Sequence, residues 1–524
     1  MIITTAKRSR LPRPQYPALL PLAAALLVAL PAHAEWKVSP SFTLSESYTD
    51  NVNLRNDETK RSSWVTEAVP GIDVQANSAR VDFTAKARLY YYDYSEESVA
   101  GLRSSEKQYD ANGRVNVVDQ LFYVDASAGA SARSISAFGP VVEDINGNRY
   151  TSDNNTDVKT WRISPYLTHR FGSFAAGTLR YSHDSVNTDS RSVYGDSTAD
   201  GIALDLVGGP GFRNIGWNLH VARQDIDNEG YGDTSSQNAM LGVNYRLGPT
   251  LSLTATGGYD KYDYQALGGR TSGVSWSTGF AWAPSARTSL QMSVGRHFLG
   301  NTGSLMALHR SRHSVWKAGY SDTVTTSRSQ FTLPAAIDTA SMLDSLFSTS
   351  IPDPALRRQA VEAYIRAAGL PPTLADSINY LTNRYMRQKL LQGSVAFNWR
   401  HSNAVFSTYA SERTALSSAE SDSELLGSQL SSLNDNVRQY GLNGSYSYRL
   451  SARSNALASL SVTRARSLST DLESKQNSLR LGLTHRFGRS VRGSLELRRT
   501  DGNSEVRRRD YTENAVSASL TVQL

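Results

Sequence analysis

Few residues in this sequence have the types and spacing that catalysis or metal binding requires. His309 and His313 are separated by four positions, which on a helix would place two imidazoles on one face, as a metal site needs. They flank the basic run 310–312 with no carboxylate nearby, so we interpret this segment as a solvated turn. No G-x-S-x-G elbow, phosphate-binding loop or dinucleotide-binding glycine pattern occurs in the chain. A hydrolase site built from distant Ser, His and Asn residues stays open, but the sequence predicts no enzyme, no metal site and no cofactor.

Basic residues give the stronger chemical signal, because many lie at every second position between apolar residues. These candidate lumen-lining cations are Lys86, Arg88, Arg114, Arg133, Arg162, Arg180, Arg480, Arg492 and Arg498. Acidic residues of the same phase are fewer, among them Asp73, Asp82, Asp125 and Glu496. If this face lines a pore, the cations lower the barrier for anions, as rings of charge do in channels. The alternative is a network of ion pairs that holds the wall in place, and the sequence leaves both open.

The elements that position these cations are amphipathic strands. In 81–91 every second residue is apolar, while Asp82, Lys86 and Arg88 lie between them, and 479–483 alternates in the same way around Arg480. Successive side chains of a strand point to opposite faces, so each stretch has one apolar and one polar face.

The connections distinguish a membrane barrel from a soluble sandwich. Short turns with Gly, Pro or basic residues occur at 171–173, 247–249, 283–285, 450–452 and 487–489. Long polar segments alternate with them at 136–156, 187–195, 226–234, 417–434 and 467–475. Short turns on one rim and long loops on the other are typical of outer-membrane barrels. We therefore predict an all-β fold, a transmembrane antiparallel outer-membrane β-barrel of 18–22 strands. An even number is expected, with both termini periplasmic, and a direct tally gives about 22.

Both ends of the chain support this prediction. Residues 1–34 combine a basic region, an apolar run and Ala32-His33-Ala34, which predicts a signal peptide cleaved before Glu35. The C-terminal assembly strand alternates Val516, Ala518, Leu520, Val522 and Leu524 with polar residues, and resembles the signal read by the barrel assembly machinery, although it ends in Leu rather than Phe. Aromatic residues near strand ends are expected to form interfacial girdles, among them Tyr90–Tyr92, Tyr94, Trp161, Trp276, Trp282, Trp399, Tyr446 and Tyr448.

Composition agrees with a barrel. The chain has 524 residues, 39% of them hydrophobic, and no Cys, so disulfides and thiolate metal sites are excluded. Removing four cations with residues 1–34 leaves 51 basic against 48 acidic residues, a charge of +3, so no nucleic-acid partner is expected. Outer-membrane lipid is the expected surrounding of residues 35–524.

The alternation stops between Gln330 and Asn383. Pro354 followed by ALRRQAVEAYIRAAG predicts an amphipathic helix that ends at Gly369. We expect 331–383 to be a partly helical extracellular or lumenal insertion that could form a lid, a plug or a plain insertion.

Four dispersed segments resemble a known family: WKVSPSFTLSESYTDNVNL at 36–54, TEAVPGIDV at 66–74, YSDTVTTSRSQF at 320–331 and YLTNRYMRQKLLQGSVAFNWR at 380–400. Together they are similar to the outer-membrane protein family associated with the PEP-CTERM/exosortase system. That family is encoded with exopolysaccharide synthesis and export genes, and it offers no catalytic residues to carry over. The resemblance implies a role in exopolysaccharide secretion or surface assembly in a Gram-negative outer membrane, with polysaccharide and periplasmic export proteins as partners.

Four functions follow as hypotheses: a polymer conduit, a general or substrate-specific diffusion porin, a non-transporting structural or docking barrel, and, with least support, an enzyme.

Overall fold

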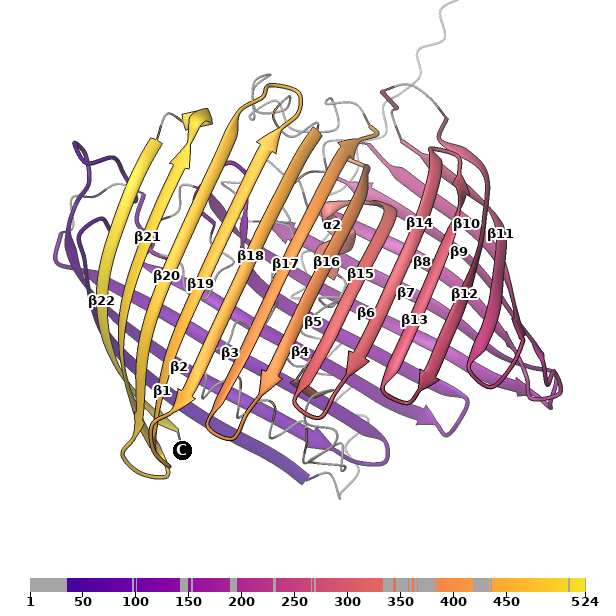
Figure 1. Cartoon of the computed structure of the whole chain (residues 1–524), viewed down its shortest axis with the longest axis horizontal. Coiled ribbons are helices and arrows are strands. Elements are labelled where there is room, and N and C mark those ends of the chain that lie inside the picture. The colour runs from indigo at the N-terminus through magenta and orange to yellow at the C-terminus, as the bar shows by residue number, and fades with distance from the viewer. Residues whose placement is uncertain are drawn as a thin grey trace, which may run out of the picture.

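Twenty-two antiparallel strands form one closed barrel in the computed structural model (Figure 1). Closure comes from the first and last strands, which pair from Ser41↔Gln523 to Thr49↔Ala515. The structure describes residues 35–523 apart from 97–98, 100, 142–148, 152–153, 189–195, 230–231, 265, 268–269, 508, and most of 333–383 and 418–435. The predicted antiparallel outer-membrane barrel is confirmed, and its strand number equals the direct tally.

The strands follow one another around the wall in chain order. The first half comprises β1 (Glu35–Thr49), β2 (Ser63–Asn77), β3 (Val81–Tyr94), β4 (Ser105–Val118), β5 (Phe122–Ser134), β6 (Asn155–Phe171), β7 (Ala175–Thr188), β8 (Ser197–Gly208), β9 (Ile215–Asn228), β10 (Thr234–Arg246) and β11 (Leu251–Asp263). The second half comprises β12 (Ser272–Ser285), β13 (Thr288–His297), β14 (Gly300–Arg310), β15 (Ser314–Thr325), β16 (Met386–Asn398), β17 (Ser402–Ala415), β18 (Asn436–Arg449), β19 (Ser454–Ser467), β20 (Glu473–Arg486), β21 (Val491–Ser504) and β22 (Arg509–Gln523). Between the strands lie the short helices α2 (Ser327–Thr332) and η3 (Glu505–Arg507).

The connections divide into a short-turn rim and a long-loop rim. The predicted turn at 171–173 follows β6, and Gly172 there adopts φ +58°, a conformation that glycine reaches without strain. The turn predicted at 283–285 lies slightly later, because β12 continues through a bulge between Trp282 and Ser285. The shortest connection on the long-loop rim is the hairpin between β13 and β14.

The apolar phase of the strands faces outward. Leu479, Leu481 and Leu483 of β20 are 44–46% exposed, as are many large apolar side chains on the other strands. Such a belt is the surface that lipid covers in outer-membrane barrels. The final strand has the predicted phase, since Leu520 is 47% exposed while the Ser519 hydroxyl contacts Ser494 Oγ at 2.6 Å inside.

One part of the girdle prediction is wrong. Tyr90, Tyr92 and Tyr94 point into the barrel, because Tyr91 between them is the exposed member of the run. Tyr92 and Tyr94 contact Tyr150 of the β5–β6 connection edge-on, at 5.6 and 6.2 Å between ring centroids. These three rings are therefore part of the interior and not of the lipid interface.

Several predictions fall on residues outside the described range. The signal peptide at 1–34, Leu524 and most of 331–383 belong to this group. Within that insertion the described residues Arg357, Val361 and Ile365 are helical. Among described residues, no helix has the length and apolar character to cross a membrane.

Candidate functional site

All nine candidate cations lie on the inward phase of their strands. Their phase follows from the register: Arg88 on β3 precedes outward Leu89, and Arg480 on β20 lies between outward Leu479 and Leu481. Six of the nine form ion pairs with inward carboxylates, namely Arg88, Arg114, Arg162, Arg180, Arg480 and Arg498. Lys86, Arg133 and Arg492 also have interaction partners. Carboxylates of the wall therefore pair with most of the predicted lumen cations.

Arg88 shows how the wall accommodates such a pair. Its Nη2 donates to both carboxylate oxygens of Asp73 on β2, at 2.9 and 3.0 Å. Gly71 lies directly opposite Arg88 in the ladder, and a Cβ there would lie 2.6 Å from Arg88 Cδ. The missing side chain thus lets the guanidinium lie along β2, where its charge-assisted hydrogen bonds to the carboxylate are stronger than neutral ones.

Asp125 on β5 serves two cations. Arg114 Nε donates to its Oδ1 at 2.8 Å, and Arg180 Nη1 donates to its Oδ2 at 3.1 Å. The Arg180 guanidinium also lies 4.0 Å from the ring centroid of Tyr166, a cation–π contact. Near the long-loop rim, Arg498 pairs with the fully buried Glu513 at 3.1 Å. Carboxylates of the wall therefore hold these cations, although the Arg114 side chain stays 59% exposed.

Helix α2 crosses the lumen. It follows β15 in the chain (Figure 1). Arg328 on this helix donates to Asp184 Oδ2 on β7 at 2.5 Å and to Ser197 Oγ on β8 at 2.9 Å. On the other side of the helix, Gln330 contacts Gln388 of β16 and accepts a hydrogen bond from Arg413 of β17 at 2.9 Å. All four wall residues have inward phase, so α2 joins two distant parts of the wall from inside.

A second crossing comes from the β5–β6 connection. Phe138 is 1% exposed and packs with inward residues of four strands on the other side, Met386, Ala415, Val437 and Ala465. Asn154 holds this turn by donating to Ser136 O and Pro140 O, both at 3.0 Å. Both crossings contact strand ends at the long-loop rim, so they narrow the extracellular half of the lumen.

A third contact joins β11 to the segment before β16. The Tyr264 ring stacks on Tyr385 at 4.8 Å between centroids. Burial raises the pKa of Tyr264 to about 12, so its hydroxyl keeps its proton at neutral pH. This contact therefore adds no charge to the lumen.

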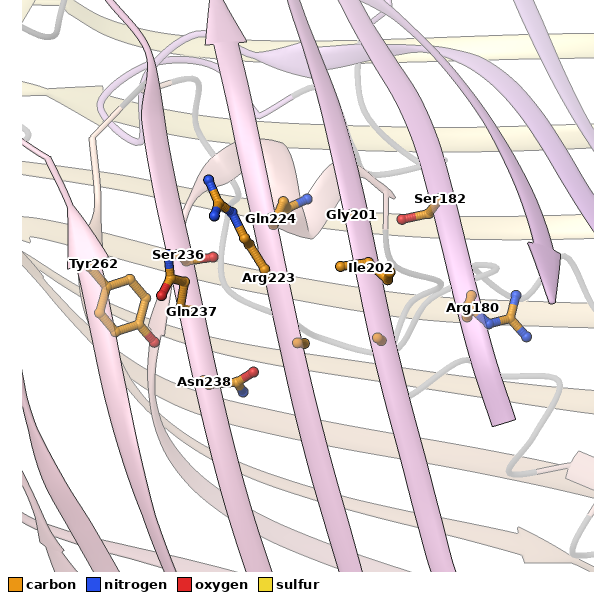
Figure 2. A pocket seen from close by; sticks show the side chains of 12 residues that line it. Arg180, Ser182, Gly201, Ile202, Arg223, Gln224, Ser236, Gln237, Asn238 and Tyr262 are labelled. Carbon is orange, nitrogen blue, oxygen red and sulfur yellow. The ribbon is translucent and has the colours of Figure 1, made fainter. Parts of the chain in front are cut away.

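Below the α2 contacts, the inner face of β7–β11 is hollowed by about 280 Å³ (Figure 2). Small residues form its floor, Gly201, Ala203 and Ala222. The absence of a side chain at Gly201 keeps the hollow open, because a Cβ there would lie 2.7 Å from Ser182 Oγ and would fill part of the hollow. Polar side chains surround the floor: Arg180, Ser182, Gln224, Ser236, Asn238 and, at one end, Tyr262.

The polar groups of this hollow are available to a ligand. The side chains of Ser182, Gln224, Ser236 and Asn238 form no hydrogen bond with any other described residue. Amides and hydroxyls that donate and accept, beside an aromatic ring, suit the hydroxyl groups and ring faces of sugars. The hollow is not among the sites predicted from the sequence. Its signal was the recurrence of small residues at inward positions on β8 and β9, but only the register between strands brings them together.

No group of three or more His, Cys, Asp or Glu able to hold a metal occurs among the described residues. His309 lies on β14, where its Nδ1 is 2.9 Å from Thr288 Oγ1 of the neighbouring strand β13, whereas His313 lies in the turn between β14 and β15.

Solved structures of outer-membrane proteins are similar to this chain over 92–94% of its length. The siderophore receptor PirA from Pseudomonas aeruginosa is 11% identical, with a TM-score of 0.39, over 93% of this chain and 80% of that one. The ferric-catecholate import receptor Fiu from E. coli is 8% identical, with a TM-score of 0.47, over 92% and 81%. A loop-deletion mutant of OmpT, an outer membrane protein of Vibrio cholerae, is 9% identical, with a TM-score of 0.32, over 94% and 99%. No family model matches the sequence, and no curated protein does. Similarity this distant does not bear on function.

Proposed function

We propose that this outer-membrane barrel takes part in exopolysaccharide secretion or surface assembly, as a conduit for polymer. The observation that carries the proposal is the hollow on β7–β11, whose amide and hydroxyl groups lack partners among the described residues. The resemblance of four sequence segments to an exopolysaccharide-associated family supports the same function.

The paired charges of the wall bear on which interactions would recognise the polymer. Since most inward cations are neutralised by carboxylates, the lumen does not attract anions through a large net field. Recognition then rests on hydrogen bonds to sugar hydroxyls, and two cations, Arg180 and Arg223, are among the residues that line the hollow. A neutral or weakly anionic polymer fits this lining better than a strongly charged one.

The two lumen crossings favour a second candidate, the non-transporting docking barrel. In the conformation described, α2 and the Phe138 turn span the extracellular half of the interior. For a conduit they must be gates that move when polymer passes. For a docking barrel they are permanent struts. A diffusion porin lacks a specific observation in its favour.

The experiment measures whether oligosaccharides block the ion conductance of the barrel. Purified barrel in planar bilayers is exposed to oligosaccharides prepared from the polymer of the producing cell, added on the short-turn side. A conduit gives transient blocks whose dwell time shortens in Asn238→Ala and Gln224→Ala. The matched control is Gln291→Ala, an amide on β13 that does not line the hollow. A barrel that conducts no ions even after the α2 anchor is removed would refute the conduit and favour docking.

A further inference from the structure

A group of cations lies on the outside of the barrel, where the wall meets the long-loop rim. Arg438 on β18, Arg464 and Arg466 on β19 and Lys475 on β20 have the same outward phase as the apolar belt. All four lie within the four residues of their strands nearest that rim. Their side chains are exposed, at 43%, 49% and 46% for Arg438, Arg466 and Lys475.

The register places these like charges face to face. Arg438 lies directly opposite Arg466, and Arg464 lies directly opposite Lys475. Like charges at directly opposed positions of a ladder destabilise a sheet unless an anion lies between them. Such an arrangement indicates a site for a negatively charged group.

Carboxylates of the protein neutralise this cluster incompletely. Glu412 accepts from Arg438 at 2.7 Å, while Glu473 lies 3.1 Å from Lys475 and 3.8 Å from Arg466. Arg466 also contacts Asp471 in the adjoining turn. Arg464 has no carboxylate partner within the described part of the chain. Its guanidinium is free to bind an external ligand.

Apolar residues continue directly below the cations. Leu442, Leu460 and Leu479 each lie four residues from a cation of the cluster toward the short-turn rim and are 43–44% exposed. Tyr440 lies directly opposite Arg464 in the ladder. A ligand that spans both zones needs an anionic headgroup and acyl chains. Arg binds phosphate with paired hydrogen bonds, and a cation at this level faces lipid headgroups rather than bulk water.

We propose that Arg438, Arg464, Arg466 and Lys475 form a binding site for a phosphorylated lipid headgroup of the outer leaflet. Phosphate oxygens lie between the opposed cations, with Arg464 as the main ligand, and the acyl chains pack on the leucines beneath. The lipid thereby fixes β18–β20 in the membrane and offsets the repulsion within the cluster.

The test uses the purified full chain in neutral detergent, titrated with bisphosphorylated lipid A in mixed micelles. Native mass spectrometry counts the bound lipid. Arg464→Ser with Lys475→Ser is expected to weaken binding about tenfold, because two charge-assisted contacts are lost. The matched control is Arg223→Ser with Lys261→Ser, two outward cations that flank Gln237 on the other side of the barrel. The control is expected to bind as the wild type does.

Further arms separate phosphate from lipid. Dephosphorylated lipid A is expected to bind the wild type as weakly as lipid A binds the Arg464→Ser, Lys475→Ser variant. Arg464→Lys keeps a positive charge, so it is expected to bind lipid A more tightly than that double variant does. Equal binding by both double variants, or by dephosphorylated lipid, would overturn the proposal. Binding of inorganic pyrophosphate as tight as that of lipid A would assign the site to a free anion instead. Heat shift on gels verifies that every variant is folded.

Discussion

Arg328 and Asp184, 144 residues apart in the chain, form a buried ion pair at 2.5 Å that fixes α2 to the inner face of β7. Asp184 also accepts from Arg162 at 3.4 Å, so one carboxylate neutralises a cation of the wall and a cation of the crossing helix. The Asp184 side chain is 1% exposed, so its carboxylate without a cationic partner would destabilise the folded barrel. This contact is the anchor of the lumen crossing.

Arg328→Gln is expected to release α2 and increase single-channel conductance in planar bilayers. Asp184 keeps Arg162 as a partner, so the wall itself should stay intact. Arg480→Gln is the control, since it also removes one lumen cation but leaves the crossing in place. An equal rise in both variants would show that charge, and not the position of α2, controls conductance.

The fold was predictable because its signal is local. Period-two alternation fixes the phase of each strand, as Leu479 and Arg480 illustrate, and turn lengths fix the order of the rims. The lumen crossings were not predictable, because Phe138 meets Met386 and Ser504 only after the barrel closes. The same holds for pairing of the cations. The alternation of apolar and polar residues predicts that Arg180 points inward, but only the register between strands shows that Asp125 is its partner.

Barrel closure predicts resistance to detergent. With β1 paired to β22, no strand edge is available in the described wall, so the protein should stay folded in SDS until boiled. Its apparent mass should shift on heating, and circular dichroism should show mainly strand. A spectrum dominated by helix would contradict the structure.

The last strand allows a test of inward and outward phase. Leu520→Asp or Val522→Asp places a charge on the lipid face, at a cost of about 1–4 kcal/mol each depending on depth. Ser519→Asp points inward beside Ser494 and should assemble better. Heat-shifted barrel in outer-membrane fractions measures assembly. Equal tolerance of the three changes would mean that the phase is reversed.

The seam between β14 and β15 is predicted to be a weak point of the wall. Their ladder runs only from Leu305↔Tyr320 to Arg310↔Val315. Beyond it, Arg387 bridges the gap by donating to Asp322 Oδ2 at 2.6 Å and to Asn301 O at 2.7 Å.

Asp322→Asn leaves Arg387 without its charge partner and should lower the free energy of unfolding by about 3 kcal/mol. Urea unfolding in detergent measures this loss. Glu412→Gln, which breaks the more exposed pair with Arg438, is the comparison and should cost much less. A smaller loss for Asp322→Asn than for Glu412→Gln would show that Arg387 does not hold the seam.

The inward cations offer the sharpest choice between selectivity and structure. Changing Arg88, Arg162 and Arg480 to Gln removes three positive charges that each pair with a carboxylate, Asp73, Asp184 and Glu496 respectively. Because the charges are paired, we expect barrel abundance and the heat-shift temperature to fall, with little change in anion preference across planar bilayers.

Adding Asp73→Asn and Glu496→Gln to that triple variant should recover much of the lost stability, since removing both partners of a pair leaves no buried charge behind. Should the triple variant instead keep its abundance and lose a marked anion preference, the cations act on ions in transit and the ion-pair interpretation is wrong. Recovery on removing the carboxylates is the decisive observation, because a selectivity role gives no reason for it.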